Sequence, residues 1–385
     1  MKKILSLFLC CLMVLTLTGC GGSNGDDITT YTYSSELDIK NLDSSDADDG
    51  CSLKAIHAVI DGLTKTDKKG NIVNAVAKSE ELSEDGLTHT YKLRKDVKWT
   101  NGDPVTAHDF VYAWQLIFRK KGSYYYMFAD GIASIEGAQE LSDKIGAGEE
   151  LTDDDLNSMG VKAIDDYTLE VKTTVRVSFL DELLTFPPFY PINEKFAEKQ
   201  GNKYGKSAKA ILGNGAFIMT NWEPGSIAEF KKNEDYYEAK TVKIEKLVMK
   251  LVQDPKVAAQ SFMAGETDYA PINSDLVDKY KDDEAFKQVY DGFLFYISVN
   301  FQNSDLANLN VRKAISLAIN RKDLCENVLK DGSQVAGGFI PSGLATSPDG
   351  VDFRKDSGNF TSYDKKKAQE SLDEGLKELG KDQLR

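Results

Sequence analysis

The sequence predicts a protein of two or more lobes of the α/β or α+β class. Strand-like and helix-like patterns alternate along the chain, as they do in α/β and α+β domains. Residues 28–385 are too many for one ordinary hydrophobic core, so two or more lobes are expected. The clearest local pattern is at residues 92–114, KLRKDVKWTNGDPVTAHDFVYAW, where a strand, a turn and a helix follow one another closely.

The N-terminus has the pattern of an export signal. A basic start precedes an apolar stretch at 4–17, which is too short for a comfortable membrane span. Small residues before Cys20 resemble a bacterial lipobox, whose cysteine is lipidated. We therefore expect a lipoprotein signal peptide at 1–19, a lipid on Cys20 and a flexible tether at 20–27. An ordinary signal peptide with a chance cysteine is the alternative.

The first elements after the tether are short. Residues 28–42 form an extended segment, and the polar loop SSDADDGC leads to a helix from about residue 52 to 63. The strand of the 92–114 segment follows, with apolar residues at odd positions on one face, namely Tyr91, Leu93, Val97 and Trp99. Asn101-Gly102 predicts a turn. Thr106 is a good N-cap, and Asp109 three residues later completes a capping box.

Further strands and helices follow with clear boundaries. Residues 161–173 predict a hairpin, whereas the proline-rich residues 186–191 fit neither a helix interior nor a central strand and suggest a crossing or hinge-adjacent segment. Residues 213–237 predict two strands around Glu223-Pro224-Gly225. Asp254 and Pro255 begin a helix at N-cap and N1. Residues 306–332 hold two helices, the second capped by Asn320, and residues 363–380 form a last charged helix.

Composition limits the chemistry. The net charge of −14, or −16 without Lys2 and Lys3, argues against a nucleic-acid partner or a polybasic membrane patch. The three histidines, His57, His89 and His108, lie in separate segments without cysteine or histidine at ligand spacing, so a zinc site is not expected. There is no HExxH or GxSxG motif. Cys51 and Cys325 could pair in an exported chain, but a buried free thiol is equally consistent with the pattern.

Several spaced segments resemble the bacterial extracellular solute-binding proteins of family 5, the oligopeptide- and dipeptide-binding type. These are residues 92–114, GNGAFIMTNWEPGSIAEFKKNEDYY, FMAGETDYA, NLNVRKAISLAINRKDLCENVLKDGSQVAGGFIPSG and YDKKKAQESLDEGL. Together they cover most of the chain. Members of this family are the capture subunits of ABC importers.

The resemblance implies a two-lobed, periplasmic-binding-protein-like fold of type II, cluster C. Residues 28–270 would form the proximal lobe, with an extra N-terminal subdomain at about 45–180, and residues 271–385 a partial distal lobe. The family chain continues beyond the 363–380 helix, so the distal lobe is expected to be incomplete and the sequence a fragment or truncated product. An aspartate that pairs with the ligand's α-amino group in peptide binders would lie beyond Arg385.

The resemblance also implies a function without catalysis or cofactor. We expect an exported, lipid-anchored and monomeric protein at the outer face of the cytoplasmic membrane or facing the periplasm. It would capture oligopeptides between its lobes and deliver them to permease subunits and their ATPases, touching the membrane only through the anchor. Ligand contacts are expected at Asp48, Asp49, Gly50, Cys51, Tyr124, Tyr125, Tyr126, Asn273, Gly292, Phe293, Phe295 and Tyr296.

Three tyrosines in a row cannot all face a core, so at least one of residues 124–126 is expected at the surface. The segment at 292–296 leads into a strand that ends at Asn300, and its alternation implies that some of its side chains pack a core. Alternatives within the family are a dipeptide, nickel chelate, haem, sugar or signalling-peptide ligand. Outside the family they are an exported lipoprotein hydrolase or a surface lipoprotein without a transport role.

Overall fold

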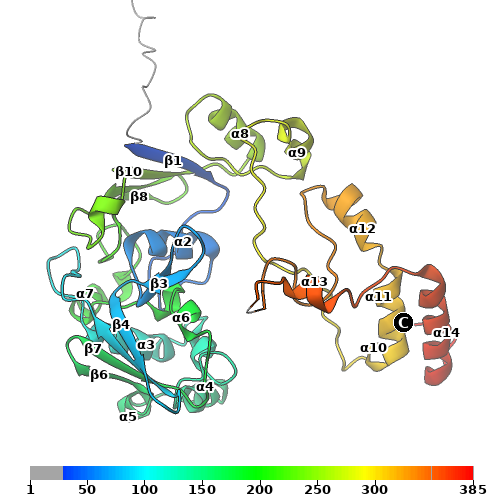
Figure 1. Cartoon of the computed structure of the whole chain (residues 1–385), viewed down its shortest axis with the longest axis horizontal. Coiled ribbons are helices and arrows are strands. Elements are labelled where there is room, and N and C mark those ends of the chain that lie inside the picture. Colours follow the sequence, from blue (N-terminus) through cyan, green and yellow to red (C-terminus); the bar gives the residue numbers. More distant parts are fainter. Residues whose placement is uncertain (1–28, 348, 385) are drawn as a thin grey trace, which may run out of the picture. The chain divides into compact units, whose positions relative to one another are not determined.

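The computed structural model describes residues 29–347 and 349–384. The chain divides into two compact units, unit 1 up to Pro271 and unit 2 from Ile272 onward (Figure 1). The predicted signal peptide, the lipid site Cys20 and the tether lie outside the described residues. No helix in the described part of the chain combines the length and the apolar character that a membrane span requires.

One sheet of unit 1 joins the start of the described chain to strands near residue 250. Its order is β1-β10-β9-β8, with β1 (Thr30–Ser35) parallel to β10 (Lys246–Leu251). The strands β9 (Ile227–Lys232) and β8 (Phe217–Glu223) continue it antiparallel, which confirms the predicted strand pair. Helix α2 (Gly50–Val59) packs on this sheet, and its Ile56 shares one buried core with sheet residues such as Met219 and Phe230.

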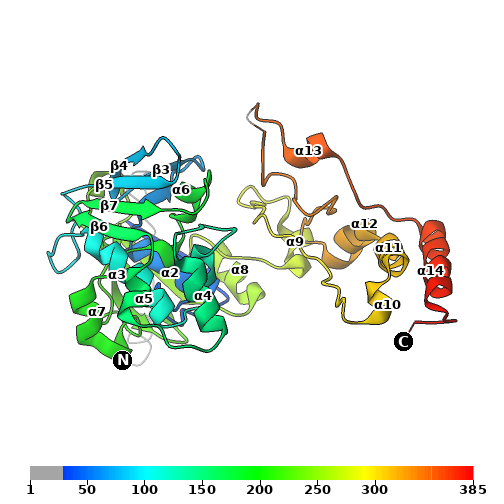
Figure 2. The ribbon, with the colours of Figure 1, turned by 90° about the horizontal axis from the view of Figure 1, so that it is seen from below.

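A second antiparallel sheet of unit 1 has the order β4-β5-β7-β6. Its strands are β4 (Ala77–Leu82), β5 (Thr88–Leu93), β7 (Thr168–Lys172) and β6 (Val161–Asp165). The β6–β7 pair confirms the predicted hairpin. Helix α3 (Ala107–Arg119) lies against one face of the sheet (Figure 2) and contacts β6 and β7. Phe110, Trp114 and Ile117 are fully buried there, as their helical spacing predicts.

The corner between β5 and α3 differs from the prediction in one respect. The strand ends at Leu93, so Val97 and Trp99 are not strand residues although both are buried. These residues pair with the chain that follows them instead, since the Trp99 amide donates to the Asp103 carbonyl across the Asn101-Gly102 turn at 2.8 Å and the Val105 amide to the Val97 carbonyl at 3.1 Å. The predicted capping box of Thr106 and Asp109 is present.

Shorter elements complete unit 1. They are β2 (Thr64–Thr66), β3 (Ile72–Asn74), α4 (Ala138–Gly146), α5 (Asp153–Asn157), α6 (Leu180–Leu183), α7 (Glu194–Gln200), α8 (Pro255–Met263) and the 3₁₀ turns η1 (Tyr125–Phe128), η2 (Pro187–Phe189), η3 (Gly201–Lys203) and η4 (Ala239–Thr241). Asp254 caps α8 as predicted.

Two predictions for unit 1 are wrong in detail. The helix expected at 52–63 is α2, which begins earlier, because Asp49 caps it, and ends at Val59, because Ile60 is extended. Residues 186–191 do not cross between the units, whereas the alternative of a hinge-adjacent segment stays a prediction. They lie within unit 1, where Phe189 packs its ring 4.3 Å from that of Phe128 and 5.7 Å from that of Trp114.

Unit 2 is made of helices and irregular segments in its described residues. Its helices are α9 (Ser274–Tyr280), α10 (Ser304–Ala307), α11 (Leu309–Ala318), α12 (Arg321–Asp323), the π-helical η5 (Leu324–Leu329), α13 (Phe353–Ser357) and α14 (Lys365–Leu379). The Asn320 side chain accepts from the Asp323 amide, which confirms the predicted cap. Helix α14 confirms the predicted last helix and packs against α11.

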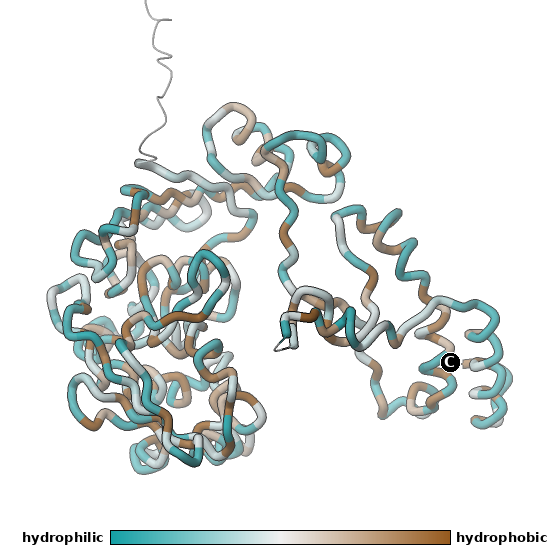
Figure 3. Tube along the Cα trace, in the orientation of Figure 1, coloured by the Kyte–Doolittle hydropathy of each residue, from teal (hydrophilic) through white to brown (hydrophobic). Residues whose placement is uncertain are grey.

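The strand expected before Asn300 is absent from the structure. Residues 285–300 have no regular structure, and none of residues 291–300 is buried, so the prediction that some of them pack a core is wrong as well. Figure 3 shows hydrophobic residues along this segment between α9 and α10. The physical reason is the lack of a neighbour, since no other described segment of unit 2 forms a strand that could pair with it.

Candidate functional site

The loop before α2 is the first part of the candidate site, and its carboxylates have different roles. Asp49 is the N-cap of α2. One of its oxygens accepts from the amides of Cys51 and Ser52, at 3.1 and 3.0 Å, and the other accepts from the Ser52 hydroxyl at 2.6 Å. Asp48 and Gly50 are exposed. The Asp48 side chain is therefore exposed, whereas the carboxylate of Asp49 is already engaged in holding the helix.

Cys51 lies beneath this loop in the core between α2 and the β1 sheet. Its thiol donates to the Leu37 carbonyl at 3.1 Å and lies 3.7 Å from the Met249 sulfur. Burial raises the pKa of the thiol. Cys51 in unit 1 and Cys325 in unit 2 both carry free thiols. The position of Cys51 favours a packing role over direct ligand contact.

The three consecutive tyrosines follow α3 and form the second part. Tyr126 is 50% exposed, which confirms that at least one of them reaches the surface. Tyr124 is half-buried, and its hydroxyl donates to the Asp48 carbonyl at 3.4 Å. Burial raises the pKa of Tyr124, and the neighbouring Tyr126 and Asp48 add to the rise. Tyr125 instead packs its ring 5.8 Å from Phe118.

A glycine brings the tyrosines close to the loop. A Cβ atom at Gly122 would lie 2.0 Å from the Ser45 carbonyl oxygen, so no other residue fits without displacing the chain. The Gly122 amide donates to the Ile117 carbonyl and closes α3 at this point. The close approach therefore joins Asp48 and Tyr124, which are distant in sequence. We call Leu37, Asp48, Gly50, Tyr124 and Tyr126 the α2 N-terminal surface.

Sequence reasoning missed two residues of this region. Leu37 is 65% exposed although it is large and apolar, and its carbonyl binds the Cys51 thiol. Phe186 packs edge-on against Tyr124 with 5.1 Å between ring centroids. The proline-rich sequence around Phe186 gave no signal of this contact. The sequence around Leu37, a single leucine after a strand, gave no signal that its side chain is exposed.

Strand β1 is the outer strand of its sheet. Residues 268–269 occupy part of that edge, since the Asp268 amide donates to the Thr32 carbonyl at 2.7 Å and the Ser34 amide to the Tyr269 carbonyl at 3.0 Å. Burial raises the pKa of Tyr33 on this strand to about 12. Beyond Ser35 the chain runs on to Leu37 without a pairing strand among the described residues. An edge of this kind can bind an extended chain through main-chain hydrogen bonds.

The other predicted contact residues belong to unit 2. Asn273 is exposed and stands at the N-cap of α9 without a side-chain cap bond. Gly292 has a φ of +72°, and Phe293, Phe295 and Tyr296 are all strongly exposed. The Tyr296 ring lies 5.6 Å from that of Phe339. Each unit thus presents aromatic side chains and free main-chain groups.

The described residues contain no group of three or more histidine, cysteine or carboxylate side chains placed to hold a metal ion. The α2 N-terminal surface offers one exposed carboxylate, tyrosine faces and, at Leu37, the main chain that follows strand β1. Such groups bind an extended, partly apolar ligand with main-chain polar groups and a cationic end.

Comparisons with known proteins agree with this chemistry. The family model described as "Bacterial extracellular solute-binding proteins, family 5 Middle" matches residues 71–385. The dipeptide-binding protein of Lactococcus lactis is 32% identical over 382 residues, which are 95% of this chain and 67% of that protein. The dipeptide-binding protein DppE of Bacillus subtilis is 31% identical over 327 residues, 85% of this chain and 58% of that protein.

The solved structure of Listeria monocytogenes OppA bound to peptide is similar as well. Its TM-score is 0.77 at 31% identity, and the match covers 94% of this chain and 70% of that one. The chain therefore spans 58–70% of the length of these three relatives. The likeness confirms the predicted two-lobed, periplasmic-binding-protein-like fold class.

Proposed function

Because the chain belongs to family 5 of the bacterial extracellular solute-binding proteins, we propose that it captures peptides outside the cytoplasm for an ABC importer. The observation that carries this proposal is the match to OppA bound to peptide over 94% of the chain. The family consists of substrate-binding proteins and not of enzymes. We accordingly assign no residue a catalytic role.

In the proposed mode of binding, the peptide lies extended and the protein holds its main chain. The main chain after Ser35 would supply hydrogen bonds, and Asp48 would attract a cationic group. Tyr124 and Tyr126 would cover apolar side chains of the peptide. In unit 2, Asn273 and the segment with Gly292, Phe293, Phe295 and Tyr296 would provide further contacts with the peptide.

The proposal extends to attachment and delivery. A lipid on Cys20 would hold the protein at the outer face of the membrane, and the tether at 20–27 would let it reach the permease. Diffusion confined to the membrane surface raises the local concentration of the loaded protein near its transporter. Treatment that blocks lipidation, or Cys20→Ala, would release the protein into the medium without changing its peptide affinity.

Native mass spectrometry of ligands that co-purify with the chain tests the proposal. A mixture of short peptides is the expected result, and its length distribution distinguishes a dipeptide from an oligopeptide binder. A single non-peptide species, such as a nickel chelate, haem or a sugar, would refute peptide capture. Isothermal titration with the recovered peptides should then give saturable binding without turnover, because turnover would indicate a hydrolase.

A further inference from the structure

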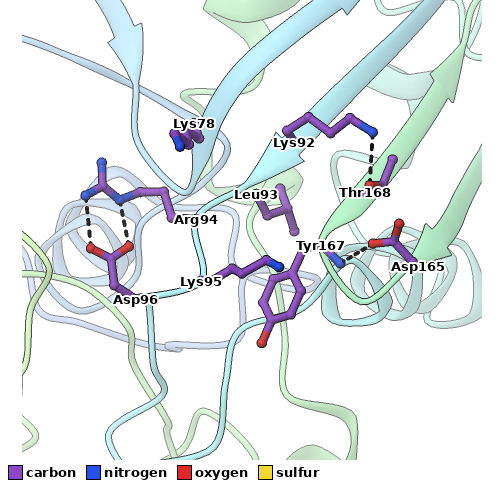
Figure 4. A pocket seen from close by; sticks show the side chains of 9 residues that line it. All are labelled: Lys78, Lys92, Leu93, Arg94, Lys95, Asp96, Asp165, Tyr167 and Thr168. Atoms are coloured by element: carbon purple, nitrogen blue, oxygen red, sulfur yellow. Dashed lines mark hydrogen bonds and ion pairs between the residues drawn. The ribbon is translucent and has the colours of Figure 1, made fainter.

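A pocket of about 740 Å³ in unit 1 is lined by none of the residues of the α2 N-terminal surface (Figure 4). It opens where β5 ends and where β4 and β7 begin. Its lining includes four cationic side chains, Lys78, Lys92, Arg94 and Lys95, but only two carboxylates, Asp96 and Asp165. In a chain with a net charge of −14, this local excess of positive charge needs an explanation.

Strand geometry gathers these cations. Lys92 alternates with the buried Tyr91 and Leu93, so it projects from the other face of the sheet, where its ammonium group donates to the Thr168 hydroxyl at 3.3 Å. Lys78 is the extra residue of a bulge, since Ala77 pairs with Leu93 but Ser79 pairs with Lys92. A bulge changes the direction of a side chain and often serves a site.

The arginine and the lysines of the pocket differ in whether they are free to bind a ligand. The Arg94 guanidinium makes two parallel bonds of 3.1 Å to the two oxygens of Asp96, as Figure 4 shows, and lies 4.6 Å from the centre of the Tyr237 ring. The Arg94 guanidinium would recognise a carboxylate ligand best, but it already binds the carboxylate of Asp96.

The three lysines have no such partner. Within the described residues, none of the ammonium groups of Lys78, Lys92 and Lys95 lies within ion-pair distance of a carboxylate. Lys95 lies 5.2 Å from the centre of the Tyr167 ring, which holds it over the pocket. Asp165 accepts the Tyr167 amide at 2.8 Å, and this bond is the main reason that its pKa is lowered.

We propose that this pocket binds a phosphate group through Lys78, Lys92 and Lys95. Three ammonium groups that line one pocket repel one another, and a multiply charged anion relieves that repulsion. Lysine binds phosphate oxygens as a point charge without the planar fork that carboxylates favour. The phosphate belongs either to a soluble molecule or to a lipid headgroup, and both sources present the same oxygens. The site is independent of the proposed peptide capture.

Two probes test the proposal on the whole chain. Isothermal titration with inorganic tripolyphosphate at low ionic strength should show saturable binding that weakens as salt is added. Sedimentation with phosphatidylcholine vesicles, with and without phosphatidylglycerol, tests the lipid source. Binding of tripolyphosphate alone assigns a soluble phosphate compound, and binding of the anionic vesicles assigns a headgroup. Saturable binding of neither probe, or tighter binding of citrate than of tripolyphosphate, would overturn the proposal.

Matched variants separate the pocket from general charge effects. The triple variant Lys78→Gln, Lys92→Gln, Lys95→Gln should weaken binding at least tenfold, and its fold should survive because all three side chains are exposed. The control Lys195→Gln, Lys199→Gln, Lys209→Gln removes the same charge from exposed positions of unit 1 outside the pocket lining and should change binding by less than twofold. Equal losses in the two variants would contradict a defined site.

A gain of affinity provides the strongest test because misfolding cannot produce it. Asp96→Asn removes a negative charge from the pocket and frees the Arg94 guanidinium, so binding of tripolyphosphate should strengthen severalfold. Asp153→Asn is the control, since it frees Arg119 from an exposed 2.8 Å ion pair elsewhere in unit 1. Unchanged affinity in Asp96→Asn, or an equal gain in both variants, would count against the pocket.

Discussion

At the scale of single residues, Asp109 is a buried acid that holds the start of α3. Its carboxylate accepts from the Thr106 amide at 2.7 Å and from the Trp99 indole at 3.3 Å. Burial outweighs these bonds and raises the pKa of Asp109 to about 6. The folded chain therefore keeps the proton of this carboxyl at pH values where the unfolded chain has lost it.

The sign of the resulting pH dependence follows directly. Between about pH 4 and 6 the folded state binds the extra proton, so the contribution of Asp109 to the free energy of unfolding falls as the pH rises. We expect the free energy of unfolding of the wild type, minus that of Asp109→Asn, to fall by on the order of 2 kcal/mol from pH 4 to pH 7. Urea unfolding at several pH values measures this difference, in which the other carboxylates cancel. A constant or rising difference would contradict it.

Tyr126 is the residue of the α2 N-terminal surface whose removal should affect peptide binding without affecting folding. It is half-exposed and belongs to neither buried core cluster. We expect Tyr126→Ala to weaken peptide binding about fivefold, the loss of roughly 1 kcal/mol of aromatic contact. Leu82→Ala is the control, because Leu82 is 56% exposed on β4, outside that surface. Titration with co-purified peptides should show no loss in the control, and equal affinities in both variants would exclude Tyr126.

Single residues could be predicted from sequence where a role depends on local spacing. The N-caps Thr106, Asp254 and Asn320 needed only their neighbours in sequence. Asp49 could not be assigned in the same way. The sequence does not show whether its carboxylate caps a helix or contacts a ligand, because the two roles differ only in the three-dimensional structure. Gly122 carried no signal, since its close approach to Ser45 involves residues that are far apart in the chain.

At the scale of elements, a polar cluster joins the β2–β3 hairpin to the segment after β9. One oxygen of Asp61 accepts from the hydroxyls of Tyr236 and Tyr237, both at 2.7 Å. The Lys65 ammonium donates to Tyr236 at 3.0 Å and to Glu238 at 2.5 Å. Burial raises the pKa of Asp61, so this carboxyl depends on the tyrosine hydroxyls for its stability in the charged form.

Removal of both hydroxyls should therefore destabilise unit 1. We expect Tyr236→Phe with Tyr237→Phe to lower the free energy of unfolding by about 2–4 kcal/mol at neutral pH, because a buried carboxylate loses two donors. The loss should shrink at acid pH, where Asp61 is protonated. Tyr112→Phe is the control, since the structure shows no hydrogen bond from the Tyr112 hydroxyl to a described residue, and it should cost little. Equal costs in both proteins would show that the cluster adds nothing.

Elements were predictable where the hydrophobic periodicity and the turn or capping residues agree, as in the 161–173 hairpin, the strands around Pro224 and helix α14. They were not predictable where the secondary structure depends on a segment that is distant in sequence. Residues 292–300 have the composition of a strand, but a strand needs a partner, and no local pattern reveals whether one is present. The proline-rich residues at 186–191 looked like a crossing because prolines break helices and strands, whereas a buried 3₁₀ turn satisfies the same rule.

At the scale of the whole chain, the two units differ in how much apolar surface they bury. Unit 1 contains both large buried clusters. In unit 2 the buried apolar residues are Leu276, Val311, Ala314 and Ala368, while Phe295 is 90% exposed. Stability within a protein follows such differences, because segments with few buried contacts open at low free-energy cost.

The segment at 287–301 should therefore be the most informative region for hydrogen exchange. Its amides make no hydrogen bond to a described residue, in contrast to those of β9 and β10. We expect exchange near the intrinsic rate at 287–301 in the ligand-free chain and slow exchange in β9, as measured by mass spectrometry of peptic fragments.

Addition of a co-purified peptide should slow exchange at Phe293–Tyr296 if these residues meet the ligand. Residues 309–318 in α11 serve as the control within unit 2, because their helical hydrogen bonds exist without ligand. Protection of 287–301 equal to that of β9 before any ligand is added would contradict the structure, and an unchanged rate at saturating peptide would remove these aromatic residues from the proposed binding site.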